Sequence, residues 1–305
     1  MEFRTITEGL EFPEGPVALA DGSVLLVEIA AGALTRVAPD GTKTVVARTG
    51  GGPNGAAIGP DGKCYVCNNG GFEWHREAGR VRPLVQAKDY SGGRIERVHL
   101  QTGTVEVLYR TCRDIPLKGP NDLVFDAHGG IFFTDLGKRR ARDMDVGAIY
   151  YAKADGSFIT EVAHPMMTPN GIGLSPDGNT LYVAETEAAR LWAFPIEAPG
   201  VVRKEPWPSP HGGRLVAGMG GYQRFDSLAV QADGRICVAT LVNGGITVIS
   251  PDGRHVEHHP FPDPMTTNIC FGGPELKTAY ITLSWTGRLV AVDWPSPGLR
   301  LHQNG

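Results

Sequence analysis

A hairpin unit that recurs six times constrains this chain more than any other feature of its sequence. Each unit opens on a polar residue, forms a short apolar strand, turns (often at Asp-Gly) and forms a second apolar strand. The opening residues are Glu14, Asn54, Asn121, Asn170, Asp226 and Asn268. The second strands end at Glu28, Asn68, Asp135, Glu185, Thr240 and Thr282. The two positions are 14 residues apart in every unit except the fourth, where they are 15 apart, so the chain repeats one β motif.

Further apolar segments follow each hairpin and extend it toward a four-stranded antiparallel sheet. Third strands are predicted at residues 33–37, 94–98, 148–151, 191–194, 246–249 and 289–292. Fourth strands are predicted at residues 44–46, 105–108, 158–162, 215–216 and 256–258. The sixth unit lacks an obvious fourth strand, which either residues 3–6 or residues 299–301 could supply. The sequence therefore predicts an all-β protein, a single six-bladed β-propeller domain over residues 1–305, because a double sandwich would not explain the constant step.

Composition excludes several classes of function. The chain has 41 Gly and 23 Pro, which suits many tight turns, and its net charge of −4 gives no reason to expect a nucleic-acid or anionic-membrane partner. The N-terminus lacks the apolar segment of a signal peptide, and no window approaches the length of a membrane span. Five cysteines are an odd, sparse set typical of buried thiols in a reducing compartment. We therefore expect a cytoplasmic protein whose partner is a small molecule, and its oligomeric state stays open.

The six opening residues, called the ring residues below, are expected to surround the propeller axis. The first strand of each blade lines the central channel, so all six openings meet at one end of it. Two ring residues, Glu14 and Asp226, are carboxylates and the others are carboxamides. A single Asn-Gly is more often a structural turn. Two carboxylates in a narrow channel, however, repel each other unless a cation lies between them.

The chemistry of the ring residues indicates which cation this channel would hold. Carboxylate and amide oxygens are hard ligands that suit Ca²⁺, Mg²⁺ or Mn²⁺. No ring residue is His or Cys, which argues against a dedicated zinc site. The sequence thus predicts a central metal-binding tunnel.

Two links between second and third strands are long, and in this topology they lie at the ring end of the channel. They span residues 69–92, which are rich in aromatic residues, and 136–146, which include a basic run. Long loops in a compact fold often bind ligands. The aromatic residues are equally compatible with a core that anchors the loop, and the basic run is interpreted as solvated surface. The candidate substrate-binding residues at this rim are Trp74, His75, Arg76 and Arg224.

Four segments resemble the senescence-marker-protein-30/gluconolactonase/luciferin-regenerating-enzyme family. They are Phe-Pro-Glu14-Gly-Pro, Pro-Asn121-Asp-Leu-Val-Phe-Asp, Pro-Asn170-Gly-Ile-Gly-Leu-Ser-Pro-Asp-Gly-Asn-Thr-Leu-Tyr-Val-Ala-Glu and Phe-Asp226-Ser. The resemblance spans about residues 12–292, and the Asn170 segment is its most specific part. It implies a six-bladed propeller with one catalytic divalent ion and a lactonase activity similar to that of gluconolactonases.

The resemblance also implies roles for individual residues. Glu14, Asn170 and Asp226 match the family's metal ligands, and Asp226 matches its proposed general base or nucleophile. Asn121 and Ser227 match positions that contact either metal or substrate in different members, Ser227 being similar to the bacterial drug-responsive lactonases. The implied ion is Ca²⁺, with Zn²⁺, Mn²⁺, Mg²⁺ or Fe²⁺ as alternatives.

One departure from the family bears on the substrate. Sugar-lactone members carry an Arg two residues before the position of Asn121, and here that residue is Gly119. We therefore expect hydrolysis of small lactones by metal-activated water, with a sugar lactone less favoured. Two alternatives remain open: a phosphotriesterase similar to the family's organophosphate-hydrolysing branch, and a non-catalytic propeller with a structural ion.

Overall fold

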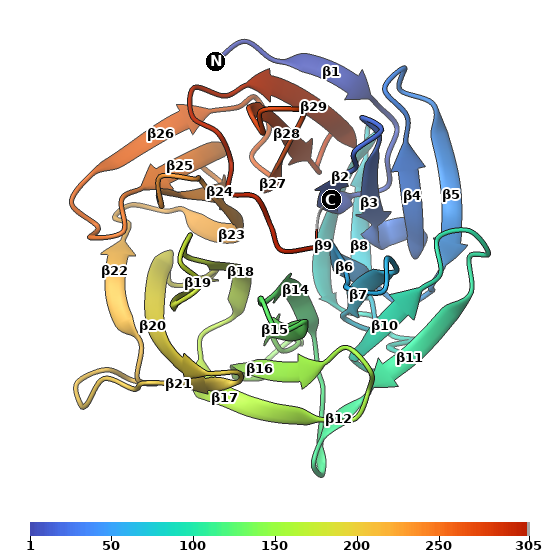
Figure 1. The fold of residues 1–305 in the computed structure, drawn as a ribbon. Coiled ribbons are helices and arrows are strands. Elements are labelled where there is room, and N and C mark those ends of the chain that lie inside the picture. The colour runs from blue at the N-terminus through green and yellow to red at the C-terminus, as the bar shows by residue number, and fades with distance from the viewer. Residues whose placement is uncertain (304–305) are drawn as a thin grey trace.

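Six antiparallel sheets, five of four strands and one of five, surround a central axis in the computed structural model, which describes residues 1–303 (Figure 1). This confirms the predicted six-bladed β-propeller and excludes the double sandwich. The predicted third and fourth strands are present in blades one to five, with bounds that differ by a few residues. Within residues 1–303, no helix has the length and apolar composition that crossing a membrane would require.

The blades follow one another along the chain. Blade one contains β2 (Pro13–Ala18), β3 (Val24–Glu28), β4 (Ala33–Val37) and β5 (Lys43–Arg48). Blade two contains β6 (Pro53–Ile58), β7 (Cys64–Asn68), β10 (Arg94–Val98) and β11 (Val105–Tyr109). Blade three contains β14 (Pro120–Phe125), β15 (Gly130–Asp135), β16 (Gly147–Lys153) and β17 (Ile159–Met166).

The second half of the ring repeats this order. Blade four contains β18 (Pro169–Leu174), β19 (Thr180–Glu185), β20 (Arg190–Ala198) and β22 (Arg214–Gly218), and β21 (Val201–Val202) also pairs with β20. Blade five contains β23 (Arg224–Val230), β24 (Ile236–Leu241), β25 (Gly245–Ile249) and β26 (Val256–Pro260). Blade six contains β27 (Thr266–Gly272), β28 (Thr278–Leu283), β29 (Arg288–Asp293) and β1 (Arg4–Thr7).

Short elements lie outside the blades. They are the 3₁₀ turn η1 (Ile29–Ala31), the hairpin of β8 (Phe72–Glu77) and β9 (Arg80–Gln86), and the pair β12 (Thr111–Cys112) and β13 (Ile115–Pro116). The β8–β9 hairpin lies in the predicted long link of blade two and brings Val81 to the backbone of Trp285 in blade six (N···O 3.0 Å). It therefore extends past blade one, which lies between blades two and six.

The N-terminal strand closes the ring. β1 is the outer strand of blade six, where Thr5 pairs with Val290 of β29 (Figure 1). Of the two candidates for this strand, residues 3–6 are therefore correct to within one residue. Residues 299–301 instead cross the middle of the ring. This pairing completes blade six with the N-terminal strand and so joins the two ends of the ring.

The hydrophobic core lies between neighbouring blades. Phe132 of blade three and Trp192 and Phe194 of blade four belong to one buried cluster, and equivalent clusters fill the other interfaces. Cys64 and Cys67 illustrate the strand period of two, because they are three residues apart on β7 and face different clusters. The Cys-x-x-Cys spacing is therefore structural.

Every first strand breaks its register near the ring end. In blade one the break lies between Glu14 and Val17, and the other five first strands have the same irregularity. A bulge at this position bends the strand and re-aims the side chains beside it. The repeated bulge thus turns the first residues of each blade toward the tunnel axis.

Blade six departs from the predicted repeat by one residue. Thr282 Oγ1 donates to the carbonyl of Asn268 (3.5 Å) as Thr134 Oγ1 donates to that of Asp122 (3.5 Å), so Asn268 corresponds to Asp122, the residue after the ring position. Thr267, not Asn268, therefore occupies the ring position. The prediction was wrong here because β27 and β28 each extend one residue further between the ring position and a turn of ordinary length, so counting 14 residues selects the wrong pair.

Candidate active site at the end of the central tunnel

The tunnel end contains two stacked layers of first-strand residues. The ring layer comprises Glu14, Asn54, Asn121, Asn170, Asp226 and Thr267, and each is at most 8% exposed. The next layer comprises Gly15, Gly55, Asp122, Gly171, Ser227 and Asn268. Asp122 and Asn268 share their local geometry: each side-chain Oδ1 accepts the following backbone N–H, at 2.9 and 2.8 Å respectively. The structure thus brings together five of the six predicted ring residues and places Asn268 one step deeper.

Glycines allow the first strands to approach one another in the second layer. A Cβ atom at Gly171 would lie 2.6 Å from the amide nitrogen of Leu228 in the next blade. At Gly15, whose φ is +50°, it would lie 2.7 Å from the carbonyl oxygen of Asn54. No side chain fits these places without a backbone shift. In the Asn-Gly and Glu-Gly dipeptides, the first residue therefore supplies the ring side chain, and the glycine allows the first strands to approach closely in the second layer.

Three carboxyl groups share this buried end. Burial is the main cause that raises the pKa of Glu14 to about 7, and hydrogen bonds from Asn268 and Gly15 oppose it. Burial, followed by the charge of Glu14, raises the pKa of Asp226 well above its usual value. The same two causes raise the pKa of Asp122 to about 7. Within residues 1–303, no Lys or Arg forms a salt bridge with any of the three.

Hydrogen bonds orient the polar ring side chains. Asn170 donates from Nδ2 to Oγ1 of Thr186 (3.1 Å), and its Oδ1 accepts a long bond from the Ser227 hydroxyl (3.5 Å). This arrangement directs the Asn170 oxygen toward the neighbouring blade that carries Asp226. Glu14 Oε2 accepts from the Gly15 amide (2.9 Å) and from Asn268 Nδ2 (2.7 Å). These contacts fix the orientation of Glu14 and Asn170 at the ring end of the tunnel.

The donor set fits a divalent cation that prefers oxygen. Among the described residues, no group of three or more His, Cys, Asp and Glu is arranged as a metal cluster. Any metal here would therefore need amide or hydroxyl oxygens beside the carboxylates, as Ca²⁺ sites commonly have. A cation would also relieve the repulsion among the buried carboxylates.

We expect the metal-free protein to lose stability as the pH rises from about 4.5 to about 7. In that interval Glu14 keeps its proton in the native state, whereas the unfolded chain releases it near the ordinary value of 4.5. Through Glu14 the native state then binds more protons than the unfolded state, which lowers the free energy of unfolding as the pH rises, and Asp122 and Asp226 act in the same direction. Buried His211, whose pKa is lowered to about 4, acts oppositely, but the three carboxyls together outweigh it. Urea titrations in EDTA at pH 5 and pH 7 measure this. A urea midpoint that increases with pH over this interval would contradict the conclusion that these carboxyl groups are buried without a basic partner.

Asp122 is the site residue that the sequence analysis missed. It follows Asn121 directly, and in an ordinary strand its side chain would face away from the tunnel. The bulge between Pro120 and Leu123 changes this, because two successive residues then face the tunnel. The signal available in the sequence was the Asp itself, where the aligned positions of three other blades have Gly.

The predicted substrate-binding residues of the β8–β9 hairpin do not act as one group. Trp74 packs on Phe12 (ring centroids 5.3 Å) and on Phe72 (6.0 Å), so it anchors the hairpin over blade one. His75 is exposed beside Glu77. Arg76 forms an exposed salt bridge with Glu11 (2.6 Å). The loop-anchoring interpretation therefore accounts for the positions of Trp74 and Arg76.

Arg224 lies at the rim, close to the ring layer. It begins β23, two residues before Asp226, and its guanidinium forms a salt bridge with Glu187 (3.1 Å). Arg139 of the basic run approaches the same carboxylate (3.7 Å). Among the four predicted substrate contacts, Arg224 is thus the one that stays next to the candidate active site.

Lys138 corrects the interpretation of the basic run as solvated surface. Its side chain is buried, and the ammonium donates to the carbonyl of Gly71 (2.8 Å) and to Oδ1 of Asn69 (3.2 Å). It also lies 3.7 Å from the centre of the Phe72 ring. Burial lowers its pKa to about 7, opposed by the charge of Asp135. Lys138 therefore joins the two long loops, whereas Arg139 and Arg140 are partly exposed.

The loop that carries Lys138 also restricts the size of the residue at position 119. A Cβ atom there would lie 2.3 Å from the carbonyl oxygen of Gly137 and 3.3 Å from Cδ of Lys138. The chain that leads to Lys138 thus occupies the place where an arginine at this position would begin. Gly119 donates its amide to Asp135 (2.7 Å), which keeps the two segments together.

The fold and this tunnel end define a six-bladed propeller with a buried, oxygen-rich site on its axis. Residues 12–284 match the family model described as SMP-30/Gluconolactonase/LRE-like region. The chain belongs to this family.

Individual relatives agree with the family assignment. A lactonase drp35 of Staphylococcus haemolyticus is 29% identical over 248 residues, which cover 81% of this chain and 68% of that protein. A structure described as a gluconolactonase of Xanthomonas campestris aligns with a TM-score of 0.74 at 22% identity, over 97% of this chain and 89% of that one. The calcium-binding protein regucalcin of Agrobacterium tumefaciens aligns with a TM-score of 0.75 at 21% identity, over 98% of both chains. At these identities the two structures support the fold alone.

Proposed function

We propose that this protein is a metal-dependent lactonase that opens small cyclic esters. The observation that carries the proposal is the buried ring layer of Glu14, Asn170 and Asp226 in a chain of this family. The relative of Staphylococcus haemolyticus, named as a lactonase, supports the reaction class. No Gly-x-Ser-x-Gly motif is present in the sequence, which disfavours a serine esterase.

Glu14, Asn170 and Asp226 are the proposed metal ligands, with Asn121, Asp122 and Ser227 as further oxygen donors to metal or substrate. A bound divalent ion would polarise the lactone carbonyl and stabilise the oxyanion that forms on it. Asp226 accepts a proton from the attacking water, because burial and the neighbouring carboxylates make it a stronger base than an exposed aspartate. Asn170 Oδ1 is directed toward the blade that carries Asp226, which supports the proposal that both residues bind the same ion.

Ca²⁺ is the proposed ion. All proposed donors are oxygen atoms, and the calcium-binding regucalcin has the same fold. We further propose a cytoplasmic location, which five free cysteines support.

Hydrolysis of a lactone panel tests the proposal. Metal-stripped protein is reloaded with Ca²⁺, Mn²⁺, Mg²⁺, Zn²⁺ or Fe²⁺, and acid release is followed with a pH indicator. We expect turnover that requires a metal, with aliphatic lactones favoured over sugar lactones by at least about tenfold, since one lost bidentate arginine contact accounts for such a factor. A preference for gluconolactone would contradict the role assigned to Gly119. Turnover of organophosphates but no lactone would replace the lactonase with a phosphotriesterase.

A further inference from the structure

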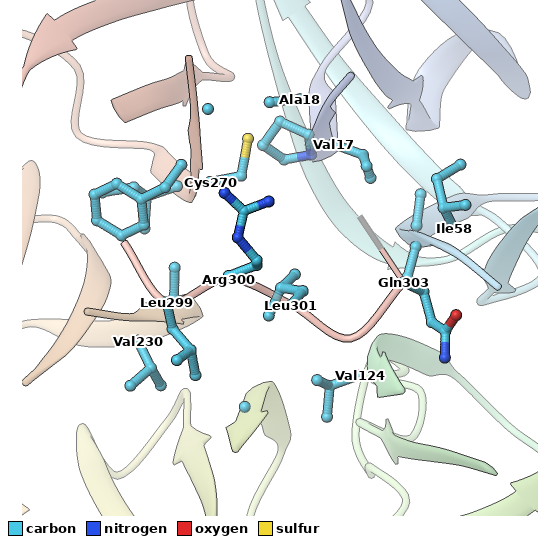
Figure 2. Close-up of a pocket in the computed structure, with 18 of the residues that line it drawn as sticks. Val17, Ala18, Ile58, Val124, Val230, Cys270, Leu299, Arg300, Leu301 and Gln303 are labelled. Carbon is cyan, nitrogen blue, oxygen red and sulfur yellow. The ribbon is translucent and has the colours of Figure 1, made fainter. Parts of the chain in front are cut away.

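The half of the tunnel farther from the ring layer contains a large cavity of about 470 Å³. Aliphatic side chains of the first strands, among them Val17, Ile58, Val124 and Val230, form its wall (Figure 2). Asp122 and Asn268 lie at its inner end. The ring residues above them do not line it. The cavity is therefore separated from the candidate active site by the second layer.

The C-terminal segment, residues 299–303, crosses the outer end of this cavity (Figure 2). Leu299 donates its amide to the carbonyl of Val230 (2.8 Å), and Gly298 donates to Leu276 (2.8 Å). A Cβ atom at Gly298 would lie 2.1 Å from the ring of Phe271, so the chain is pressed onto blade six at this point. These contacts hold the segment across the opening.

Arg300 gives the opening a positive charge. Its side chain runs from the segment toward Cys270 (Figure 2). Within residues 1–303, Arg300 forms no salt bridge and no hydrogen bond through its side chain, and it stays exposed to solvent. The other ionisable groups of the lining are Asp122 at the inner end, His302 on the segment and Cys270, whose thiol pKa burial raises to about 12. Positive charge thus lies at the outer end and a carboxyl group at the inner end.

We propose that this cavity is a second ligand site, which takes a medium-chain aliphatic carboxylate. The alkyl chain would lie between the aliphatic walls, which offer water too few hydrogen bonds to hold it well. The carboxylate would lie at Arg300, because Asp122 at the inner end would repel it. Four residues of strand separate Gly15 from Leu19, which makes the cavity about 13 Å deep and long enough for an eight-carbon chain. The site is independent of the proposed lactonase activity.

Calorimetric titration of the full chain with octanoate and with octanol tests this site. We expect saturable binding of both, with octanoate the tighter ligand. Arg300→Gln should weaken octanoate about fivefold, as expected for a partly exposed ion pair, and leave octanol unchanged. Arg254→Gln is the matched control, because Arg254 is an exposed arginine of the β25–β26 turn outside the cavity lining. Equal effects of the two substitutions on octanoate would overturn the carboxylate assignment.

A second variant locates the site. Ile58→Trp adds bulk to the cavity wall and should abolish binding of both ligands, while a cooperative thermal transition shows that the propeller still folds. Leu299→Trp repeats the test from the C-terminal segment if the first variant does not fold. Absence of saturable binding to the wild type, or unchanged binding to both tryptophan variants, would overturn the proposal and leave the cavity as a solvent-filled part of the tunnel.

Discussion

Replacing Asp226 with alanine is expected to lower kcat for lactone hydrolysis by at least about 1,000-fold. General acid–base catalysis alone contributes about 10²- to 10⁴-fold, and the proposed role as a metal ligand adds to the loss. The measurement is the steady-state rate on an aliphatic lactone at saturating metal. Asp226→Asn is made alongside it, because the amide keeps the shape of the side chain and cannot accept the proton.

The controls separate chemistry from folding. Asp252 lies in the exposed turn between β25 and β26, and Asp252→Ala should leave kcat within about twofold of the wild type, as is usual for a surface change. Asp122→Asn identifies the alternative base: if it abolishes turnover and Asp226→Asn does not, the proton acceptor is Asp122. An unchanged kcat in Asp226→Ala would refute the mechanism.

Removing the metal should abolish turnover and lower the melting temperature by roughly 5–10 °C. A ligand that binds only the native state at about 100 times its Kd stabilises that state by about 2.7 kcal/mol. In a chain of this size, each kcal/mol corresponds to roughly 2–4 °C. The stabilisation arises because the cation neutralises carboxylates that the fold buries without a basic partner. Thermal unfolding with Ca²⁺, and again with EDTA, measures it.

Asp226→Asn again supplies the matched control for this second effect. Asn is neutral without taking up a proton, whereas burial raises the pKa of Asp226 and forces that proton on it, so the metal-free variant should melt higher than the metal-free wild type. Added Ca²⁺ should stabilise the variant less, because Asn supplies no carboxylate. A Ca²⁺ response of Asp226→Asn equal to that of the wild type would place the ion elsewhere in the molecule. Full turnover of the wild type in EDTA would refute the metal dependence.

The repeat was predictable because it depends on local rules. Asp-Gly turns between apolar segments specify hairpins, and a hairpin of constant length places its polar opening residue at the same point of each blade. Five ring residues, Glu14 to Asp226, could therefore be found by counting. Counting failed at Asn268, since β27 and β28 are each one residue longer than their counterparts between the ring position and the turn.

Other features of the site depend on residues far apart in the sequence. Asp122 faces the tunnel because of a bulge, which the alternation of residues along the strand does not predict. Lys138 was interpreted as part of a solvated basic run, but in the folded protein its ammonium contacts the Gly71 carbonyl and the Phe72 ring. The packing of Trp74 on Phe12 likewise depends on the position of the β8–β9 hairpin beside blade one.

The sequence by itself determined the number of blades, their strand order and the chemical type of most ring residues, because turns and strand periodicity are set by neighbouring residues. Only the tertiary structure decided which terminal segment closes blade six and which covers the tunnel. Residues 3–6 and 299–301 are both short and apolar in part, so propensity does not distinguish them. Long-range pairing of β1 with β29, and packing of Gly298 on Phe271, made that choice.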